Sequence, residues 1–181
     1  PDVKAPVGSY VATKVIGKLL FVSGQISINE NGQLIKGKIG KELTTEDGYN
    51  AAKRCGLSII SQAKNACDND LSKIKSCIKL TGYVNSTVDF IEQPKVINGA
   101  SDIIASIFGD AGMHTRAAVS ANSLPLGVSV EVDAIFELNW FIYRHHNNQY
   151  SIFSFLKLNT YCAYRIFWIS VFLLIFWNLI I

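Results

Sequence analysis

The stretch HTRAAVSANSLPLGVSVEVDAIFEL, residues 114–138, decides the fold, because it predicts two strands separated by a Leu-Pro-Leu-Gly turn. We expect the strands at 115–121 and 127–138. In the second strand, apolar side chains alternate with polar ones, which is typical of a strand with one buried face. The two strands carry Arg116 and Glu131. On neighbouring strands, these two side chains are expected to lie within reach of each other.

Arg116 and Glu131 form a chemically suggestive pair. A guanidinium is a planar fork of donors that binds a carboxylate through two parallel hydrogen bonds. A nearby glutamate can orient or deprotonate a water molecule. The pair therefore indicates hydrolytic chemistry on a small carboxylic acid. The alternative is structural: Arg116 forms an ion pair across the sheet, and Glu131 pairs with Arg116 or Lys79 where subunits meet.

Upstream of this stretch the sequence predicts further strands and two helices, in the order β-β-(β)-α-β-α-β-β with the bracketed strand optional. This order predicts an α+β fold, with a single mixed sheet and both helices packed on one face. The expected elements are a hairpin of 9–15 and 19–23, a helix from Thr44 or Thr45 to about Ala66, a strand over 74–84 and a helix over 91–108.

Side-chain periodicity assigns faces to these elements. We expect Ile78 and Leu80 on one face of the 74–84 strand and Cys77 on the other. In the last strand, the apolar side chains from Val128 to Phe136 are expected to meet the helices, which leaves Glu131 on the opposite face. That free face favours an oligomer with sites between subunits. The second helix is expected to bury Val96, Ile97, Ala100, Ile104, Ile107 and Phe108.

Charge argues against one class of partner. The chain has a formal net charge of +3, but residues 1–138 hold 14 basic and 14 acidic side chains and are neutral. The excess comes from Arg144, Lys157 and Arg165. A neutral domain without a basic cluster argues against nucleic acid as a partner.

Cysteines and histidines predict no metal site. The four cysteines show no CxxC or other ligand spacing, and the chain has only three histidines. Cys55 recurs with buried positions of the first helix, so we expect a small core hydrophobe rather than a nucleophile. We expect His114 to be a solvated loop residue. Free thiols indicate a reducing compartment, and we expect a cytoplasmic protein.

Residues 139–181 differ from the rest and are expected to form a separate hydrophobic, aromatic-rich tail. They contain 13 of the 20 aromatic residues and no Asp, Glu, Gly or Pro. Segment 161–181 has the length of a C-terminal membrane anchor. A membrane is expected as a partner only if this segment is a genuine anchor. The alternative is a non-native translated extension, because the composition is that of translated AT-rich sequence. The chain begins at Pro1, which leaves an upstream organelle-targeting segment open.

Three stretches carry a family resemblance: LFVSGQISINENGQLIKGKIG at 20–40, QPKVINGASDII at 93–104 and the 114–138 stretch. They resemble the Rid family, the reactive-intermediate deaminases also called YjgF or L-PSP endoribonuclease-like proteins. The resemblance covers about residues 5–138 and is closest to a divergent branch. It implies a chorismate-mutase-like fold and a homotrimer with three clefts between subunits.

The resemblance also implies a site. Arg116 matches the arginine that grips the substrate carboxylate, and Glu131 matches the glutamate that handles the hydrolytic water. Ala118 stands where the family often has cysteine, so its backbone lines the site without a thiol. The remaining substrate-binding residues implied are Tyr10 near the cleft mouth, Ser23 and Gly24 in the pocket loop, and Asn98 in the second helix.

The implied activity is hydrolysis of small 2-imino or enamine acids to 2-keto acids and ammonia, which requires no metal or cofactor. Two alternatives stay open at this point. One is a non-catalytic carboxylate-binding or regulatory protein of the same fold. The other is an endoribonuclease, an activity reported for some family members, against which the neutral charge weighs.

Overall fold

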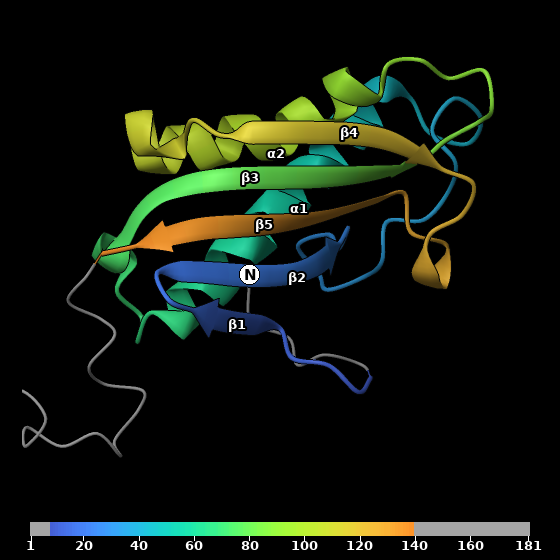
Figure 1. Ribbon diagram of the computed structural model, residues 1–181. Coiled ribbons are helices and arrows are strands. Elements are labelled where there is room, and N and C mark those ends of the chain that lie inside the picture. Colours follow the sequence, from blue (N-terminus) through green and yellow to red (C-terminus); the bar gives the residue numbers. More distant parts are fainter. Residues whose placement is uncertain (1–7, 140–181) are drawn as a thin grey trace, which may run out of the picture. The chain divides into compact units, whose positions relative to one another are not determined.

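A five-stranded sheet in the order β1-β2-β5-β3-β4 forms one layer of the protein, and two long helices form the other (Figure 1). The computed structural model describes residues 8–139. The strands are β1 (Thr13–Ile16), β2 (Leu19–Ile26), β3 (Ile74–Asn85), β4 (Thr115–Ala121) and β5 (Val130–Leu138), and the helices are α1 (Thr45–Ala66) and α2 (Gln93–Phe108). Only the β3–β4 pair is parallel. The α+β prediction, with a single mixed sheet and both helices on one face, is confirmed.

The helix boundaries follow local chemistry. The Thr44 hydroxyl accepts a hydrogen bond from the Asp47 backbone N–H (3.1 Å), and the Asp47 carboxylate accepts one from the Thr44 N–H (2.9 Å). This reciprocal capping box starts α1 where the sequence predicts it. Pro94 lies in the first turn of α2, where its missing N–H costs nothing. Both helix predictions are therefore confirmed to within two residues.

The optional strand and the start of the hairpin differ from expectation. β1 begins at Thr13 rather than Ser9. The segment after β2 makes only isolated bridges, Ile28 with Leu34 and Lys36 with Val128, so the optional strand does not form.

The core lies between the helices and the sheet. Val128, Val130, Val132, Ala134 and Phe136 are all buried on the helix side, as the alternation of the last strand predicts. From α2 the core takes Val96, Ile97, Ala100 and Ile104, but Ile107 is 43% exposed and the prediction for it is wrong. The next residue, Phe108, ends the helix and packs against the core instead, with its ring centroid 6.0 Å from that of Phe136.

Two irregularities in β3 overturn the face assignment there. The register between β3 and β5 shifts between Ile74 and Ser76 and again between Cys77 and Lys79. Each shift breaks strict alternation, because an extra residue on one strand turns the following side chains to the other face. Cys77 is therefore buried, and Ile78 is 38% exposed. Burial raises the pKa of Cys77 to about 12.

The strands that carry Arg116 and Glu131 are not neighbours. β3 lies between them, parallel to β4 and antiparallel to β5. The cause is the helix between β3 and β4: a strand–helix–strand unit places its second strand parallel and beside its first. The sheet position beside β4 is then filled by β3, and β5 pairs on the other side of β3. The expectation of neighbouring strands is wrong.

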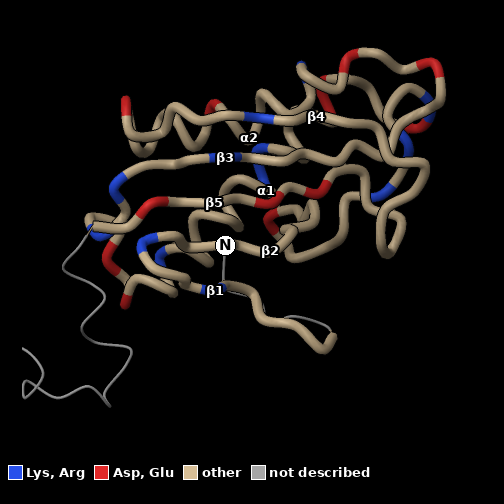
Figure 2. Tube along the Cα trace, viewed as in Figure 1, with Lys and Arg blue, Asp and Glu red and all other residues tan. Residues whose placement is uncertain are grey.

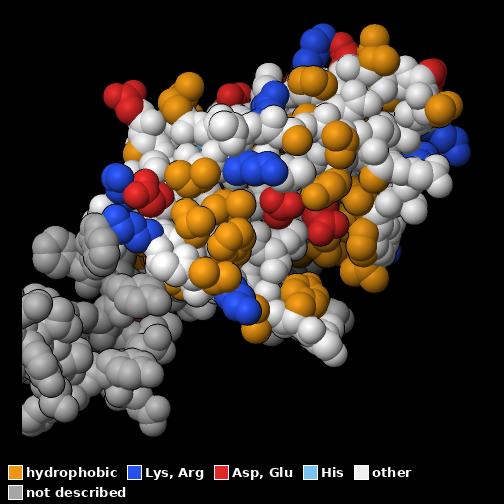
Figure 3. Space-filling model, in the orientation of Figure 1, with side chains coloured by type: hydrophobic (Ala, Val, Ile, Leu, Met, Phe, Trp, Pro, Cys, Tyr) orange, Lys and Arg blue, Asp and Glu red, His pale blue; other side chains and the backbone are white. Residues whose placement is uncertain are grey.

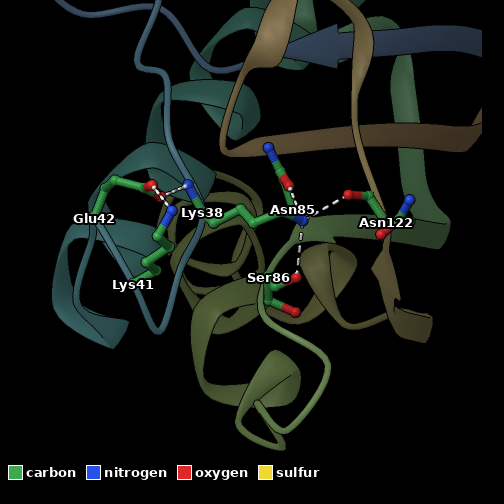
Figure 4. A network of polar contacts seen from close by, with 6 residues as sticks. All are labelled: Lys38, Lys41, Glu42, Asn85, Ser86 and Asn122. Atoms are coloured by element: carbon green, nitrogen blue, oxygen red, sulfur yellow. Dashed lines mark hydrogen bonds and ion pairs between the residues drawn. The ribbon is translucent and has the colours of Figure 1, made fainter.

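A lysine secures the loop that passes the end of β3 (Figure 4). The Lys38 ammonium donates to the Asn85 side-chain oxygen (3.1 Å), the Ser86 carbonyl (3.2 Å) and the Asn122 carbonyl (2.6 Å). Asn85 in turn donates to the Val128 carbonyl at 3.0 Å. These contacts hold both ends of the 122–128 loop against β3, so Lys38 has a structural role.

Close packing of α1 against α2 generates the first prediction. A Cβ atom added to Gly99 would lie 2.0 Å from the Tyr49 carbonyl oxygen of α1. In an isolated helix, glycine to alanine stabilises by about 1 kcal/mol. Here we expect Gly99→Ala to lower the free energy of unfolding by about 1–3 kcal/mol, because the backbones must separate. Urea unfolding checks this.

The matched control is Ser106→Ala on the same helix, where the hydroxyl is exposed and bonds only to the Ile103 carbonyl. It should leave the unfolding midpoint almost unchanged. A Gly99→Ala protein as stable as the wild type would contradict the close helix contact.

Candidate functional site

Arg116 lies on the edge strand β4 and points to the helix side of the sheet. Its register partner Leu80 is in the core, and its guanidinium contacts α2. Nη1 donates to the Asn98 side-chain oxygen (2.8 Å) and to the Ser101 hydroxyl (3.0 Å), and Nη2 donates to the Pro94 carbonyl (3.4 Å). The structure thus brings Arg116 and Asn98 together.

The Arg116 guanidinium keeps two donors available. Of its five N–H groups, both on Nη1 and one on Nη2 are used. Within residues 8–139, no acceptor bonds to the Nε proton or to the second Nη2 proton, and Nε and Nη2 are adjacent on the planar group. In residues 8–139 no carboxylate forms an ion pair with Arg116. The alternative of a structural ion pair across the sheet is therefore wrong within this part of the chain.

His114 and Ser101 lie beside Arg116, and neither was expected to take part in its hydrogen-bonded surroundings. The His114 ring nitrogens lie 3.0 Å from the Ser101 hydroxyl and 2.6 Å from the Gly112 carbonyl, so His114 is not a solvated loop residue. Ser101 was missed by the sequence analysis. Its position three residues after Asn98, on the same helix face, is the signal that could have found it.

Ala118 lies two residues along β4 from Arg116 and packs partly against the core. Alternation along a strand places it on the same side of the sheet as Arg116. The half-buried methyl group leaves only backbone to line a site here.

Glu131 lies on the other side of the sheet, which neither α1 nor α2 covers. A Cβ atom added to Gly24 would lie 1.9 Å from the Glu131 Oε1 atom, so the carboxylate rests directly on the Gly24 backbone. Glycine is the only residue that permits this approach without moving the carboxylate. The structure therefore brings Glu131 and Gly24 together.

The electrostatics around Glu131 disfavour its charge. Half-burial raises the pKa of Glu131, and the negative charge of Asp133 raises it further. Asp133 itself accepts a hydrogen bond from the Tyr83 hydroxyl at 3.3 Å. A glutamate with a raised pKa is a better proton acceptor when ionised than an exposed one. Asp133 and Tyr83 were missed, although Asp133 shares the Glu131 face by simple alternation.

Ser23 and Tyr10 lie at the same end of the sheet as Gly24. The Ser23 hydroxyl donates to the Val11 carbonyl (2.8 Å), and the Ser23 N–H donates to the Ala12 carbonyl (2.9 Å). Ser23 thus ties the segment that contains Tyr10 to the irregular part of β2 beside Glu131. Tyr10 is 55% exposed. Its ring is available at the surface, as a residue at a cleft mouth would be.

The expected residues therefore form two clusters in one chain, which we name the arginine cluster (Arg116, Asn98, Ala118) and the glutamate cluster (Glu131, Gly24, Ser23, Tyr10). Arg116 is level with Leu80 and Ala134, while Glu131 is three residues away on β5. Two strand spacings and three residues of rise separate the two Cα atoms by about 14 Å. The side chains also point to opposite faces. The two clusters cannot act on one small substrate within one copy.

The described cysteines are core residues. Cys55, Cys67 and Cys77 are buried, and burial raises the pKa of the Cys55 thiol well above its usual range. The prediction that Cys55 is a small hydrophobe is confirmed. Within residues 8–139, no helix has the length and apolar character to cross a membrane, and no cluster of metal-ligating side chains forms. The proposed anchor at 161–181 lies outside the described residues.

Comparison with known proteins identifies relatives of this fold and sequence. Residues 1–138 match the family described as "YjgF/chorismate mutase-like, putative endoribonuclease". Protein TCP17 of Trypanosoma cruzi is 44% identical over 140 residues, which cover 77% of this chain and 87% of that protein.

Solved structures of related proteins have the same fold. A protein of unknown function from Agrobacterium tumefaciens is 43% identical with a TM-score of 0.71, covering 75% of this chain and 86% of the other. A protein of Shewanella oneidensis, described as a "putative endoribonuclease", is 36% identical with a TM-score of 0.73, covering 76% and 91%. The chain therefore belongs to the YjgF/chorismate mutase-like family.

Proposed function

We propose that the protein hydrolyses small 2-imino or enamine acids to 2-keto acids and ammonia, in a cleft formed by two copies of the chain. The observation that carries this proposal is the free edge of the Arg116 guanidinium, which neutral acceptors hold in place. Two parallel donors on one edge match the geometry of a substrate carboxylate. The resemblance of the sequence motifs to the reactive-intermediate deaminases implies the same reaction class.

The reaction needs few groups. Arg116 binds the substrate carboxylate and orients the imine carbon, which is already electrophilic. Water attacks that carbon while Glu131 accepts a water proton, and the C=N electron pair moves to nitrogen, which takes that proton from Glu131. The resulting carbinolamine then collapses: its hydroxyl proton passes through Glu131 to the amino nitrogen, the C–N bond breaks, and ammonia leaves as the keto group forms.

A second copy supplies the missing half of the site in this proposal. The arginine cluster of one copy meets the glutamate cluster of another, because one chain holds them on opposite faces. The uncovered sheet face supports self-association (Figure 3): its strands expose Ile16, Leu19, Phe21, Ile78 and Val119. A patch of apolar side chains of this kind is typical of an interface. The homotrimer that the resemblance implies is the assembly we expect.

Two other functions compete with this one. A carboxylate-binding protein without turnover needs only the arginine cluster, and calorimetry showing 2-oxobutyrate binding without imine hydrolysis would favour it. RNA cleavage is suggested by the description of the Shewanella relative. Basic and acidic residues are interspersed along the chain (Figure 2), which does not favour a polyanion. Loss of ribonuclease activity in Arg116→Ala would favour RNA cleavage.

The role of Arg116 is tested by a substitution that keeps its charge. Arg116→Lys loses the planar fork, so kcat/KM for 2-iminobutyrate generated in situ should fall about 100-fold. Ammonia release measures this. Arg54→Lys is the control, since Arg54 holds only the Ile28 carbonyl and Glu30 on another surface. Equal activity of Arg116→Lys and wild type would contradict the proposal.

The pH dependence of kcat/KM tests Glu131. The base must be ionised, and its raised pKa means that it is protonated at a higher pH than an ordinary glutamate as the pH falls. The acid limb of the profile should therefore lie above the usual glutamate range. Asp133→Asn removes the neighbouring charge, which lowers the pKa of Glu131 and moves the acid limb to lower pH. Coincident profiles would exclude Glu131 as the base.

Gly24 offers a test that separates binding from turnover. Alanine there meets only the flexible end of Glu131, so the free energy of unfolding should change by less than about 1 kcal/mol. The carboxylate must nevertheless move, and we expect Gly24→Ala to lower kcat at least tenfold. Affinity for 2-oxobutyrate should be unchanged, because Arg116 is untouched. Unaltered kcat would mean that Glu131 does not act from this position.

A further inference from the structure

A chain of hydrogen bonds leads from the loop before β4 to Arg116 and lies outside the residues discussed for the reaction. The His114 Nδ1 atom lies 2.6 Å from the Gly112 carbonyl oxygen. The Nε2 atom of the same ring lies 3.0 Å from the Ser101 hydroxyl. The Ser101 oxygen in turn lies 3.0 Å from Arg116 Nη1. Three side chains and one carbonyl group are thus linked by a continuous series of hydrogen bonds.

The chemistry of the groups sets the direction of the bonds at Gly112 and at Arg116, and a neutral His114 ring sets the direction of the bond between His114 and Ser101. A carbonyl oxygen only accepts, so His114 Nδ1 carries a proton and donates to Gly112. In a neutral imidazole the Nε2 atom is then an acceptor, and the Ser101 hydroxyl donates to it. Arginine only donates, so Arg116 Nη1 donates to a lone pair of the Ser101 oxygen. Each group has a matching partner, and no alternative tautomer of His114 satisfies Gly112.

This direction matters for Ser101. A serine hydroxyl within a helix readily donates to a backbone carbonyl of the preceding turn. Such a bond would turn the Ser101 lone pairs away from Arg116. Because His114 accepts the hydroxyl proton, the lone pair stays aimed at Nη1. His114 therefore acts on Arg116 without touching it.

The hydrogen bonds from Arg116 to Ser101 and Asn98 fix the plane of its guanidinium group. Ser101 and Asn98 together occupy both protons of Nη1. Among residues 8–139, no acceptor bonds to the Nε proton or to the second Nη2 proton, so both are available to a ligand. An arginine held by only one of these acceptors could rotate about its last bonds and would lose the two-point geometry.

We propose that Ser101 and His114 are positioning residues that hold Arg116 in the orientation for two-point binding of a small carboxylate. This rests on the proposed function only in assigning carboxylate binding to Arg116. It needs no turnover, so it can be tested by binding alone.

Binding of 2-oxobutyrate to the full-length protein, measured by calorimetry, provides the first test. Ser101→Ala and His114→Asn should each raise the Kd about tenfold, and the double variant should bind no more weakly than Ser101→Ala alone. Ser101→Thr keeps the hydroxyl and should restore binding. Ser106→Ala, on the same helix but away from Arg116, is the matched control and should bind as the wild type does.

Two further readouts separate positioning from a general structural effect. In imine hydrolysis, KM should rise about tenfold while kcat changes less than about twofold, because carboxylate binding is made equally in the ground and transition states. The ¹⁵N shifts of the His114 ring should show the proton on Nδ1, and Ser101→Ala should move the Nε2 signal.

The outcomes distinguish this inference from the proposed function. Unchanged Kd in Ser101→Ala, a His114 proton on Nε2, or no 2-oxobutyrate binding by the wild type would overturn the positioning role. Binding that weakens as expected, in a protein that hydrolyses no imine, would support the positioning role while refuting the proposed hydrolysis.

Discussion

The parallel pairing of β4 with β3 is the constraint on which the candidate site depends. It makes β4 an edge strand, places β3 between the two strands that carry Arg116 and Glu131, and requires the 122–128 loop to pass the end of β3. Lys38 holds that loop with three oxygen acceptors. Because register along a strand also sets the face of every side chain, the same pairing turns Arg116 toward α2 and leaves Glu131 on the uncovered face.

The two clusters differ in their electrostatics: the arginine cluster keeps a positive charge, and the glutamate cluster disfavours a negative one. Arg116 is held by neutral acceptors, which orient a positive charge without neutralising it. Glu131 is half-buried on the Gly24 backbone and beside Asp133, which together oppose its ionised form. A cation that lacks a counter-charge and a carboxylate with a raised pKa are both unfavourable for the isolated chain. Arrangements of this kind are typical of sites that bind or transform a charged ligand.

Local features of the fold were predictable from sequence because they depend on near neighbours in the chain. The Thr44–Asp47 capping box, the early Pro94 of α2 and the alternation of β5 each have a cause within a few residues. The expectation for Ile78 and Cys77 was wrong, because the bulges in β3 arise from pairing with β5 and leave no local signal. His114 was misjudged for the same reason, since its Ser101 partner lies on another element.

The sequence by itself determined the element types, the single mixed sheet and the helix-facing side of β5, and it singled out Arg116 and Glu131 as candidates. Periodicity, capping and turn chemistry are sufficient for these, since each is local. Only the tertiary structure decided that β3 separates the pair, that Arg116 is fixed by α2 and that Glu131 rests on Gly24. These features depend on which distant segments pair and in which register, and that choice is made by burial of the whole core rather than by any one stretch.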